Sequence, residues 1–164
     1  VYTPLKKRSK AAVYVGTIPG ALPVIIGFAA VEGTISTLAI VVFLIQILWQ
    51  LPHFWAIAWL GDNDYKNAGF EMLPSKNNAK DEQVGYHCLM ASLFLAIISF
   101  LVFAVYDVGV VVFGIMAIIN AMYIFYSWKL YVEQTDQSAR KLMFSSFLYL
   151  PVVLFSLLIG GLWM

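Results

Sequence analysis

Five long apolar stretches dominate this sequence and restrict what it can fold into. A helix needs about 20 apolar residues to cross the hydrocarbon core of a bilayer, and each stretch is long enough. The stretches lie near residues 11–31, 35–60, 86–106, 108–128 and 142–164. The chain is 62% hydrophobic and 12% charged, which is far more apolar than a soluble domain. We therefore expect an all-α fold, a polytopic membrane helix bundle with five transmembrane helices.

The positive charges occupy only alternate gaps between these stretches. All ten Lys and Arg residues fall in segments 1–10, 61–85 and 129–141. Because the chain crosses the membrane twice between one such segment and the next, the three segments lie on one side, which the positive-inside rule makes cytoplasmic. We expect residues 1–164 to form one transmembrane domain, with the C-terminus outside. The net charge of +1 gives no indication of nucleic-acid binding.

The second stretch carries a line of polar residues. Gln46, Gln50 and His53 are spaced i, i+4 and i+7, so they share one face of a helix. Polar groups in a membrane span are costly and normally face the bundle interior. A lone His on an apolar face is more often a packing residue than a ligand. In this line, however, His53 could ligate heme iron or donate to a heme propionate.

Two other spans have features that permit more than one interpretation. The first span contains Pro19 and Pro23 among several glycines. It is either a kinked helix that packs closely on its neighbours or a bent helix that lines a cavity. In the fourth span, Asn120 and Tyr123 at i and i+3 form a second polar point that could face inward.

Two carboxylates, Asp62 and Asp64, follow the second span directly and lie beside Lys66. Such charges can simply be solvated. Glycines and a proline nevertheless frame this segment, which predicts a turned conformation, and a second basic cluster precedes the first span. Mg²⁺ is usually held by one or two carboxylates together with substrate phosphates. The pattern therefore favours a magnesium–diphosphate site at the mouth of an apolar cavity.

Four strings of residues carry a resemblance to a known family. They are YTPLKKRS (2–9), GTIPGALPVIIGF (16–28), WQLPHFWAIAW (49–59) and DYKNAGFEMLP (64–74). In order and spacing they resemble the protoheme IX farnesyltransferase (heme O synthase) branch of the UbiA-type intramembrane prenyltransferases. That fold has nine helices around a cavity open to the cytoplasmic leaflet, with acidic motifs on two cytoplasmic loops.

The resemblance implies that this chain supplies the C-terminal five helices and the second acidic loop. The chain begins at Val1, and we expect the missing N-terminal helices and the first acidic motif upstream, so that this piece alone is inactive. The family often has a second aspartate four residues after the position of Asp64. Ala68 stands there in this sequence, and Asp62 is the available substitute.

The resemblance also implies a reaction, in which farnesyl diphosphate alkylates the 2-vinyl group of heme b to give heme O. Heme b is then a substrate, Mg²⁺ is the cofactor, and a partner enzyme of the heme A pathway is possible. Asp64 would act as the catalytic metal ligand, with Asp62 beside it. Diphosphate would contact Lys6, Lys7, Arg8 and Lys66. Heme or the allylic cation would meet His53, Gln50, Gln46, Trp49, Phe54, Trp55, Tyr123 and Asn120.

Two other functions remain open at this stage. A prenyltransferase of the same fold could act on a quinone or chlorophyll precursor, and product analysis with heme or an aromatic acid would decide. Broken helices and polar residues near the membrane midplane are also typical of transporters. A transporter half predicts an inverted repeat of these helices and solute flux that does not depend on diphosphate.

Overall fold

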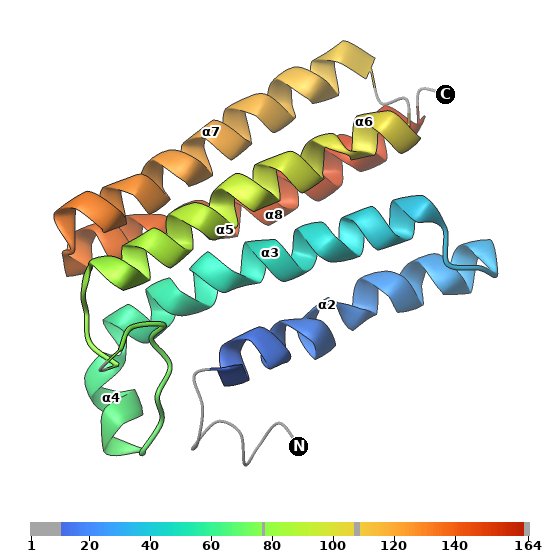
Figure 1. Cartoon of the computed structure of the whole chain (residues 1–164). Coiled ribbons are helices and arrows are strands. Elements are labelled where there is room, and N and C mark those ends of the chain that lie inside the picture. The colour runs from blue at the N-terminus through green and yellow to red at the C-terminus, as the bar shows by residue number, and fades with distance from the viewer. Residues whose placement is uncertain (1–10, 77, 107–108, 163–164) are drawn as a thin grey trace.

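The computed structural model describes residues 11–76, 78–106 and 109–162, and every regular element in this part of the chain is an α-helix (Figure 1). The helices are α2 (Ala11–Glu32), α3 (Thr37–Leu60), α4 (Asp62–Asn67), α5 (Glu82–Phe100), α6 (Val102–Val105), α7 (Gly109–Glu133) and α8 (Asp136–Leu162). The expected all-α fold is confirmed.

Five helical segments are long and apolar enough to cross a membrane, as the sequence predicts. They are Ala12–Glu32, Thr37–Leu60, Glu82–Val105, Gly109–Glu133 and Asp136–Gly160. The third combines α5 with the short α6. Large apolar side chains are exposed along all five, which is the composition expected of a surface that faces lipid. The chain is an integral membrane protein.

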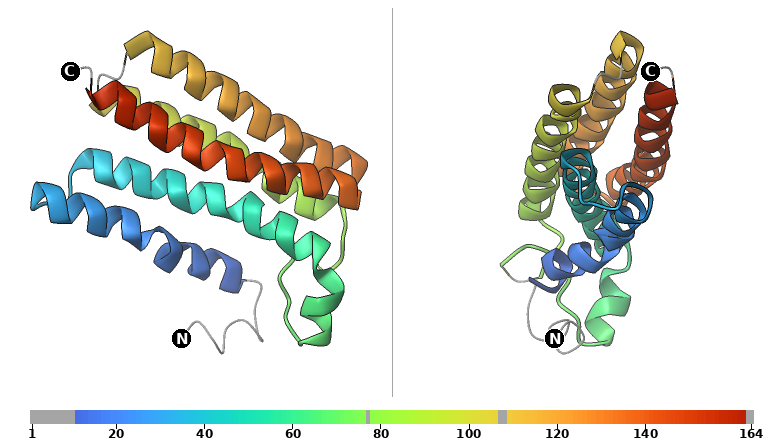
Figure 2. Two further views of the ribbon diagram at one scale, coloured as in Figure 1. Left: turned by 180° about the vertical axis from the view of Figure 1, so that it is seen from behind. Right: turned by 90° about the vertical axis from the view of Figure 1, so that its right-hand side faces the viewer.

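Helices α3, α5, α7 and α8 form a four-helix bundle, and α2 lies outside it against α3 (Figure 2). Helix α3 contacts α2, α5 and α8, whereas α7 packs on α5 and α8. The buried residues include Trp55, Met116 and Leu142. Helix α3 is continuous through Pro52. It is thus the central helix, and the polar residues it carries are placed among its neighbours.

Two connections are shorter than the sequence predicts. Segment 129–141 is not a loop, because α7 continues to Glu133 and α8 begins at Asp136. An ion pair of 3.0 Å between Lys129 and Glu133 supports the last turn of α7. Thr135 and Ser138 exchange hydrogen bonds from each backbone N–H to the other hydroxyl, which is a capping pattern that starts a helix. Hydropathy does not detect such polar helix ends.

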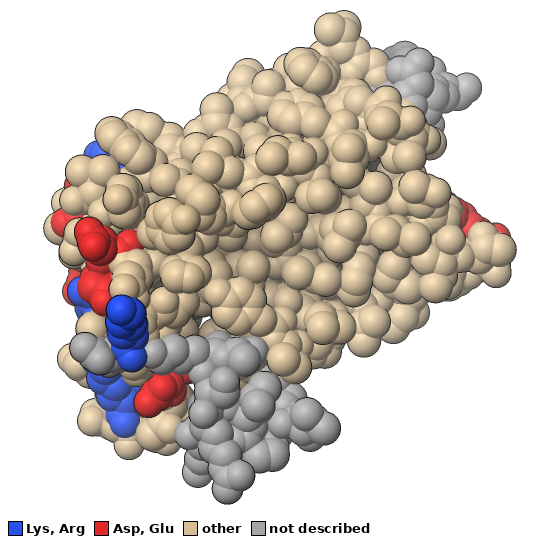
Figure 3. Space-filling model, in the orientation of Figure 1, with Lys and Arg blue, Asp and Glu red and all other residues tan. Residues whose placement is uncertain are grey.

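The segment between α3 and α5 also contains more helix than expected. Residues 62–67 form α4, and α5 begins at Glu82 because the carboxylate of Asp81 accepts the N–H of Gln83 at 3.0 Å. The described Lys and Arg residues lie on these connections or on the helix ends beside them. Figure 3 shows most of the charged atoms of one face gathered at this end, with one acidic patch at the opposite end and uncharged surface along the helices between them. We call the end of the bundle that carries the α3–α5 and α7–α8 connections the charged end.

Candidate functional site

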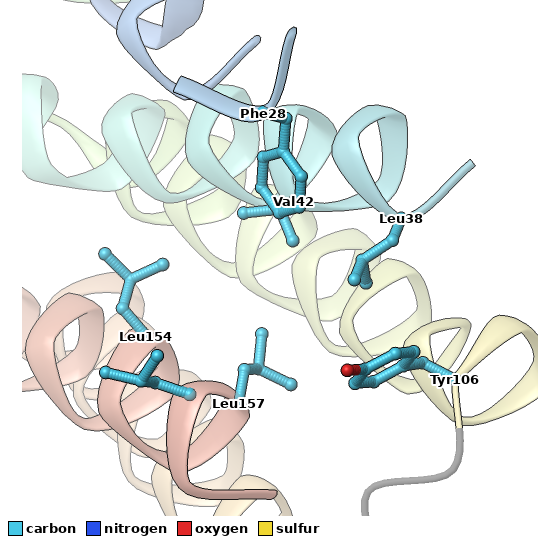
Figure 4. A pocket seen from close by; sticks show the side chains of 7 residues that line it. Phe28, Leu38, Val42, Tyr106, Leu154 and Leu157 are labelled. Atoms are coloured by element: carbon cyan, nitrogen blue, oxygen red, sulfur yellow. The ribbon is translucent and has the colours of Figure 1, made fainter. Parts of the chain in front are cut away.

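An apolar hollow opens between α2 and α8, with α3 as its floor (Figure 4). Its volume is about 370 Å³, and its lining residues are Phe28, Leu38, Val42, Tyr106, Leu154, Leu157 and Leu158. A second hollow of about 390 Å³ adjoins it and shares Phe28, Val42 and Leu154. It extends along α2 past Pro23 and Gly27. Helix α2 therefore both packs on α3 and lines a hollow, and the kink or bend that its prolines predict stays a prediction.

The polar line of α3 continues the face that floors this hollow. Leu38, Val42, Gln46, Trp49 and His53 follow one another at steps of four or three residues, so they lie on one side of the helix. Val42 and His53 are separated by about 16 Å along the axis. The face is thus apolar far from the charged end and polar closer to it.

His53 is anchored to α8. Its Nδ1 lies 2.7 Å from the Ser146 hydroxyl, which donates to the carbonyl of Met143. With that hydroxyl proton on the Met143 carbonyl, Ser146 is left to accept from His53, and we assign the imidazole proton to Nδ1 on this ground. No described residue bonds to Nε2. His53 is 8% exposed and its ring stacks on Trp49 with centroids 5.1 Å apart, so in this tautomer Nε2 keeps a lone pair in a fixed orientation.

Gln50 joins α3 to α2. Its Nε2 donates to the carbonyl of Thr17 at 3.3 Å and to that of Gln46 at 3.1 Å. The side chain of Gln50 is buried and lies directly against Gly20, where a Cβ would overlap its Oε1. Gln46 itself is half-buried. Gln50, the second member of the polar line, therefore helps to hold α2 in place.

Trp49 joins three helices. Its indole N–H donates to the carbonyl of Ser146 in α8 at 2.8 Å, and its own carbonyl accepts the Tyr123 hydroxyl of α7 at 3.0 Å. The half-buried indole remains on the face that floors the hollow. Trp49 is therefore both a structural junction and a candidate wall of the site.

Three other predicted cavity residues lie elsewhere. Trp55 is buried and packs edge-on against Tyr14 and His87, towards α2 and α5. Tyr123 and Asn120 are buried inside the four-helix bundle. There the Tyr149 hydroxyl donates to Asn120 Oδ1 at 3.0 Å, and Asn120 Nδ2 donates to Ser99 at 2.8 Å. The structure does not bring these side chains to the hollow.

The acidic residues lie on α4, beyond the end of α3. Asp62 is buried and its carboxylate pairs with Lys66 at 2.8 Å. Asp64 is exposed, and no hydrogen bond or ion pair links its side chain to another described residue. Lys6, Lys7 and Arg8 lie outside the described residues. The predicted diphosphate residue Lys66 is thus engaged with the predicted second metal ligand, and of the two predicted metal ligands it is Asp64 that presents an open carboxylate.

These donors fit part of a magnesium–diphosphate site. Among the described residues, no three His, Cys, Asp or Glu side chains come together to hold a metal ion. A Mg²⁺ ion carried by substrate phosphates needs only one or two carboxylates from the protein. Asp64 would supply one such ligand, and Asp62 would become a second only if Lys66 moved from its carboxylate to the phosphates.

Two residues that support this region are not recognised from the sequence alone. Ser146 fixes the orientation of His53, and Asp136 accepts the indole N–H of Trp59 at 2.9 Å. Each pairing joins α3 to α8 over many residues of sequence, so no local pattern reveals it. Asp136 follows Thr135 at the start of a helix, and that capping pattern is the one signal that could have drawn attention to it.

A membrane bundle with an apolar hollow, beside a helix face that becomes polar towards the charged end, is consistent with an enzyme that handles a lipid-like substrate. The sequence model of the UbiA prenyltransferase family matches residues 1–150, and the chain belongs to that family.

Individual relatives give a more specific comparison than the family as a whole. The chain is 40% identical over 153 residues to a protoheme IX farnesyltransferase of Cytophaga hutchinsonii, covering 93% of this chain and 53% of the relative. Proteins of the same name from Flavobacterium psychrophilum and Nitrosomonas europaea are 37% and 34% identical, covering 93% and 94% of this chain and 52% and 51% of the relatives. The chain spans about half the length of the curated relatives it matches. No solved structure matches it.

Proposed function

We propose that this chain forms part of the active site of an intramembrane farnesyltransferase that converts heme b to heme O. Family membership and the names of the relatives support the reaction class. The structural observation that carries the proposal is the face of α3 that leads from the apolar hollow to His53. Such a face suits a substrate with an apolar tail beside a second substrate that offers a metal centre.

The hollow is the proposed site of the farnesyl tail. Its lining is aliphatic or aromatic, with the Tyr106 side chain as the polar exception. Burial of a hydrocarbon chain from water contributes about 0.8 kcal/mol per CH₂. The tail enters from the bilayer, however, where it is already surrounded by hydrocarbon. The hollow therefore contributes mainly orientation, by directing the diphosphate of the substrate towards the charged end.

His53 is the proposed ligand of heme iron. Its Nδ1 donates to Ser146, so the nitrogen that remains is an acceptor and cannot donate to a propionate unless the ring gains a proton. Neutral imidazole with one fixed nitrogen and one lone pair is the usual arrangement of a metal-binding His. Of the two roles that the sequence allows, the hydrogen bonds support iron ligation.

The charged end is the proposed diphosphate site, and we place it on the cytoplasmic side of a bacterial inner membrane. Asp64, with Asp62 beside it, would hold Mg²⁺, and Lys66, Lys6, Lys7 and Arg8 would contact phosphate oxygens. Mg²⁺ would neutralise the charge that develops on the leaving group. The allylic C–O bond breaks with its electron pair passing to diphosphate. The vinyl group forms the new C–C bond, and water adds to the resulting cation with loss of a proton.

The test is product analysis with the complete protein in proteoliposomes. Farnesyl diphosphate, heme b and Mg²⁺ should yield heme O and pyrophosphate, identified by mass spectrometry. The Asp64→Ala variant should lose at least about 100-fold in turnover, which is the usual loss when one stabilising group for developing charge is removed. Glu71→Ala, which removes an exposed carboxylate of the same connection, should retain activity.

Other outcomes would replace this proposal. Prenylation of an aromatic acid with no product from heme would indicate a quinone-pathway enzyme. Solute flux that does not depend on diphosphate would indicate a transporter. Unchanged heme O output from Asp64→Ala would remove the α4 carboxylate from the reaction.

A further inference from the structure

A single carboxylate oxygen connects three separate segments at the charged end. Oδ1 of Asp136, the first residue of α8, accepts the indole N–H of Trp59 at 2.9 Å and the ammonium group of Lys80 at 2.9 Å. Trp59 belongs to the last turn of α3, and Lys80 lies just before α5. The Lys80 ammonium also lies over the Trp59 ring, 5.8 Å from its centroid. We call this set of three residues the Asp136 junction.

The Asp136 junction should contribute more to stability than an ordinary surface ion pair does. Trp59 is 1% exposed, so without Asp136 its N–H would be a buried donor with no partner, which is unfavourable. The side chain of Lys80 is 31% exposed, and its position over an indole face adds a cation–π attraction. Asp136 is also favourably placed for a negative charge, at the N-terminus of a long helix.

The two partners of Asp136 are the two ends of the segment that carries the acidic residues. The chain leaves the bundle after Trp59, forms α4 with Asp62 and Asp64, and returns at Lys80. Between those ends, hydrogen bonds join residues of the segment to one another. The Phe70 N–H donates to the Tyr65 carbonyl at 2.8 Å.

Further hydrogen bonds within the segment extend to Ala79, which precedes Lys80, where the chain returns to the bundle. The N–H of Leu73, a residue 1% exposed, donates to Asn78 Oδ1 at 2.9 Å, and Ser75 Oγ accepts the Ala79 N–H at 2.7 Å. A segment that is internally braced moves as a unit. Its position relative to the bundle depends on the packing of Leu73 in the core and on the bond from the Lys76 N–H to Gln83 Oε1 of α5 at 3.0 Å. It also depends on how the two ends of the segment are held.

We propose that Asp136 is a positioning residue for the diphosphate site. By holding both ends of the segment 60–79 against α8, it fixes where α4 places Asp64 relative to the polar face of α3. It touches no substrate itself. This inference rests on the proposed function, because it assigns the α4 carboxylates to the diphosphate of that reaction.

The kinetic test separates the charge of Asp136 from its hydrogen bond. Asp136→Asn keeps an oxygen for the Trp59 N–H but removes the charge that holds Lys80, and Lys80→Met removes the other partner. In the complete protein, each variant should raise KM for farnesyl diphosphate by about fivefold or more and leave KM for heme b within about twofold. The double variant should be no worse than either single one, since both remove the same contact.

The matched control is Glu133→Gln. Glu133 is also a carboxylate of the charged end in an ion pair, with Lys129, but both partners belong to α7 and the pair joins no separate segments. It should change neither KM. A similar loss for both substrates, or additive losses in the double variant, would show that Asp136 only stabilises the fold and would overturn the proposal.

A second measurement does not depend on turnover. A nitroxide label on Glu71→Cys reports the mobility of the segment, and Cys88 does not compete for the label because it is fully buried. The label should become more mobile in Asp136→Asn and Lys80→Met than in the unmodified junction, and Mg²⁺ with pyrophosphate should restrict it only when the junction is intact. An unchanged spectrum overturns the positioning role. If the protein makes no heme O while the label responds as described, the proposed reaction fails and the junction stands.

Discussion

The seam between α5 and α7 and the seam between α2 and α3 are both close helix contacts, but they differ in what makes the contact. At Gly85 of α5 a Cβ would overlap the backbone of Tyr131 in α7. At Gly20 of α2 a Cβ would overlap only the end of the Gln50 side chain. Backbone cannot move aside without shifting a helix, whereas a side-chain amide can rotate. The first seam is therefore rigid, and the second, which borders the hollow, can adjust.

The polar groups of the two regions also differ, in whether all of their hydrogen-bonding atoms are paired within the protein. In the interior, Asn120 uses both of its amide hydrogens and its oxygen within the bundle, through Ser99, Met116 and Tyr149. On the α3 face, His53 uses one nitrogen and keeps the other. A polar group that is fully paired inside the protein specifies structure. A buried group with an unused lone pair is available to a ligand, and this difference separates the bundle from the site.

The largest loss of stability should come from Gly85→Ala. The added methyl group meets the Tyr131 backbone, so α5 and α7 must separate, and overpacking of this kind costs about 3 kcal/mol. Unfolding in mixed micelles would measure the change. Gly114→Ala is the control, since a Cβ there meets nothing within 4 Å and alanine is the better helix former. Equal stability of the two variants would mean that the α5–α7 seam is not rigid.

Asn120→Ala should cause the second largest loss of stability. It leaves the buried hydroxyl of Tyr149 without its acceptor and removes a bond to Ser99, which should cost about 1 to 2 kcal/mol in a membrane protein. The same micelle unfolding measures it, with Asn63→Ala, at an exposed position of α4, as the control. Activity per folded molecule should hardly change. A selective loss of activity at full stability would place Asn120 in the site after all.

Gly20→Ala should have a smaller effect, of about 1 kcal/mol, because the Gln50 amide can rotate away at the loss of its bond to Thr17. A double-mutant cycle with Gln50→Ala tests this cause. Removing the amide creates room for the methyl group, so the two changes together should be less harmful than their sum. Strict additivity would mean that Gly20 is needed for some other reason.

The sequence predicts the spans well because hydropathy over about 20 residues is a local quantity. It fails at helix ends, where Lys129 pairs with Glu133 and Thr135 with Ser138, since those interactions stabilise helix in polar sequence. The spacing of Gln46, Gln50 and His53 correctly predicts one polar side of α3 because helix periodicity is also local. What each residue meets is not local and has to come from the fold.

The candidate site shows the same limit, because a local sequence pattern does not reveal what each residue contacts in the fold. An i, i+3 pair such as Asn120 and Tyr123 looks alike in sequence whether it faces a cavity or a neighbouring helix, and here both residues bond to other helices. Asp62 and Asp64 differ by only two positions, yet one is buried in an ion pair and the other is exposed. That difference arises because residues 62–67 form a helix, which directs side chains two positions apart to different sides.

The smallest change in stability, and the sharpest contrast with the interior, should come from His53→Asn. The asparagine amide can still donate to the Ser146 hydroxyl in place of Nδ1, but it has no atom at the position of Nε2. The unfolding free energy should therefore fall by less than about 1 kcal/mol, while affinity for heme b should fall by more than the roughly 10-fold expected when only the partner of a metal-binding His is lost, if Nε2 is the iron ligand. The heme absorbance spectrum of the complete protein measures both the ligation and the affinity.

Ser146→Ala makes this test specific to the tautomer. It removes the acceptor that keeps the proton on Nδ1 and leaves the imidazole in place, so heme affinity should fall by about 10-fold, as is usual when the partner of a metal-binding His is lost. If His53 were only a packing residue, neither variant would alter the heme spectrum, and both would lower stability to an extent set by the ring and its Ser146 bond. Fixed ligation therefore requires two results together: a spectrum changed by both substitutions, and a stability that His53→Asn barely affects.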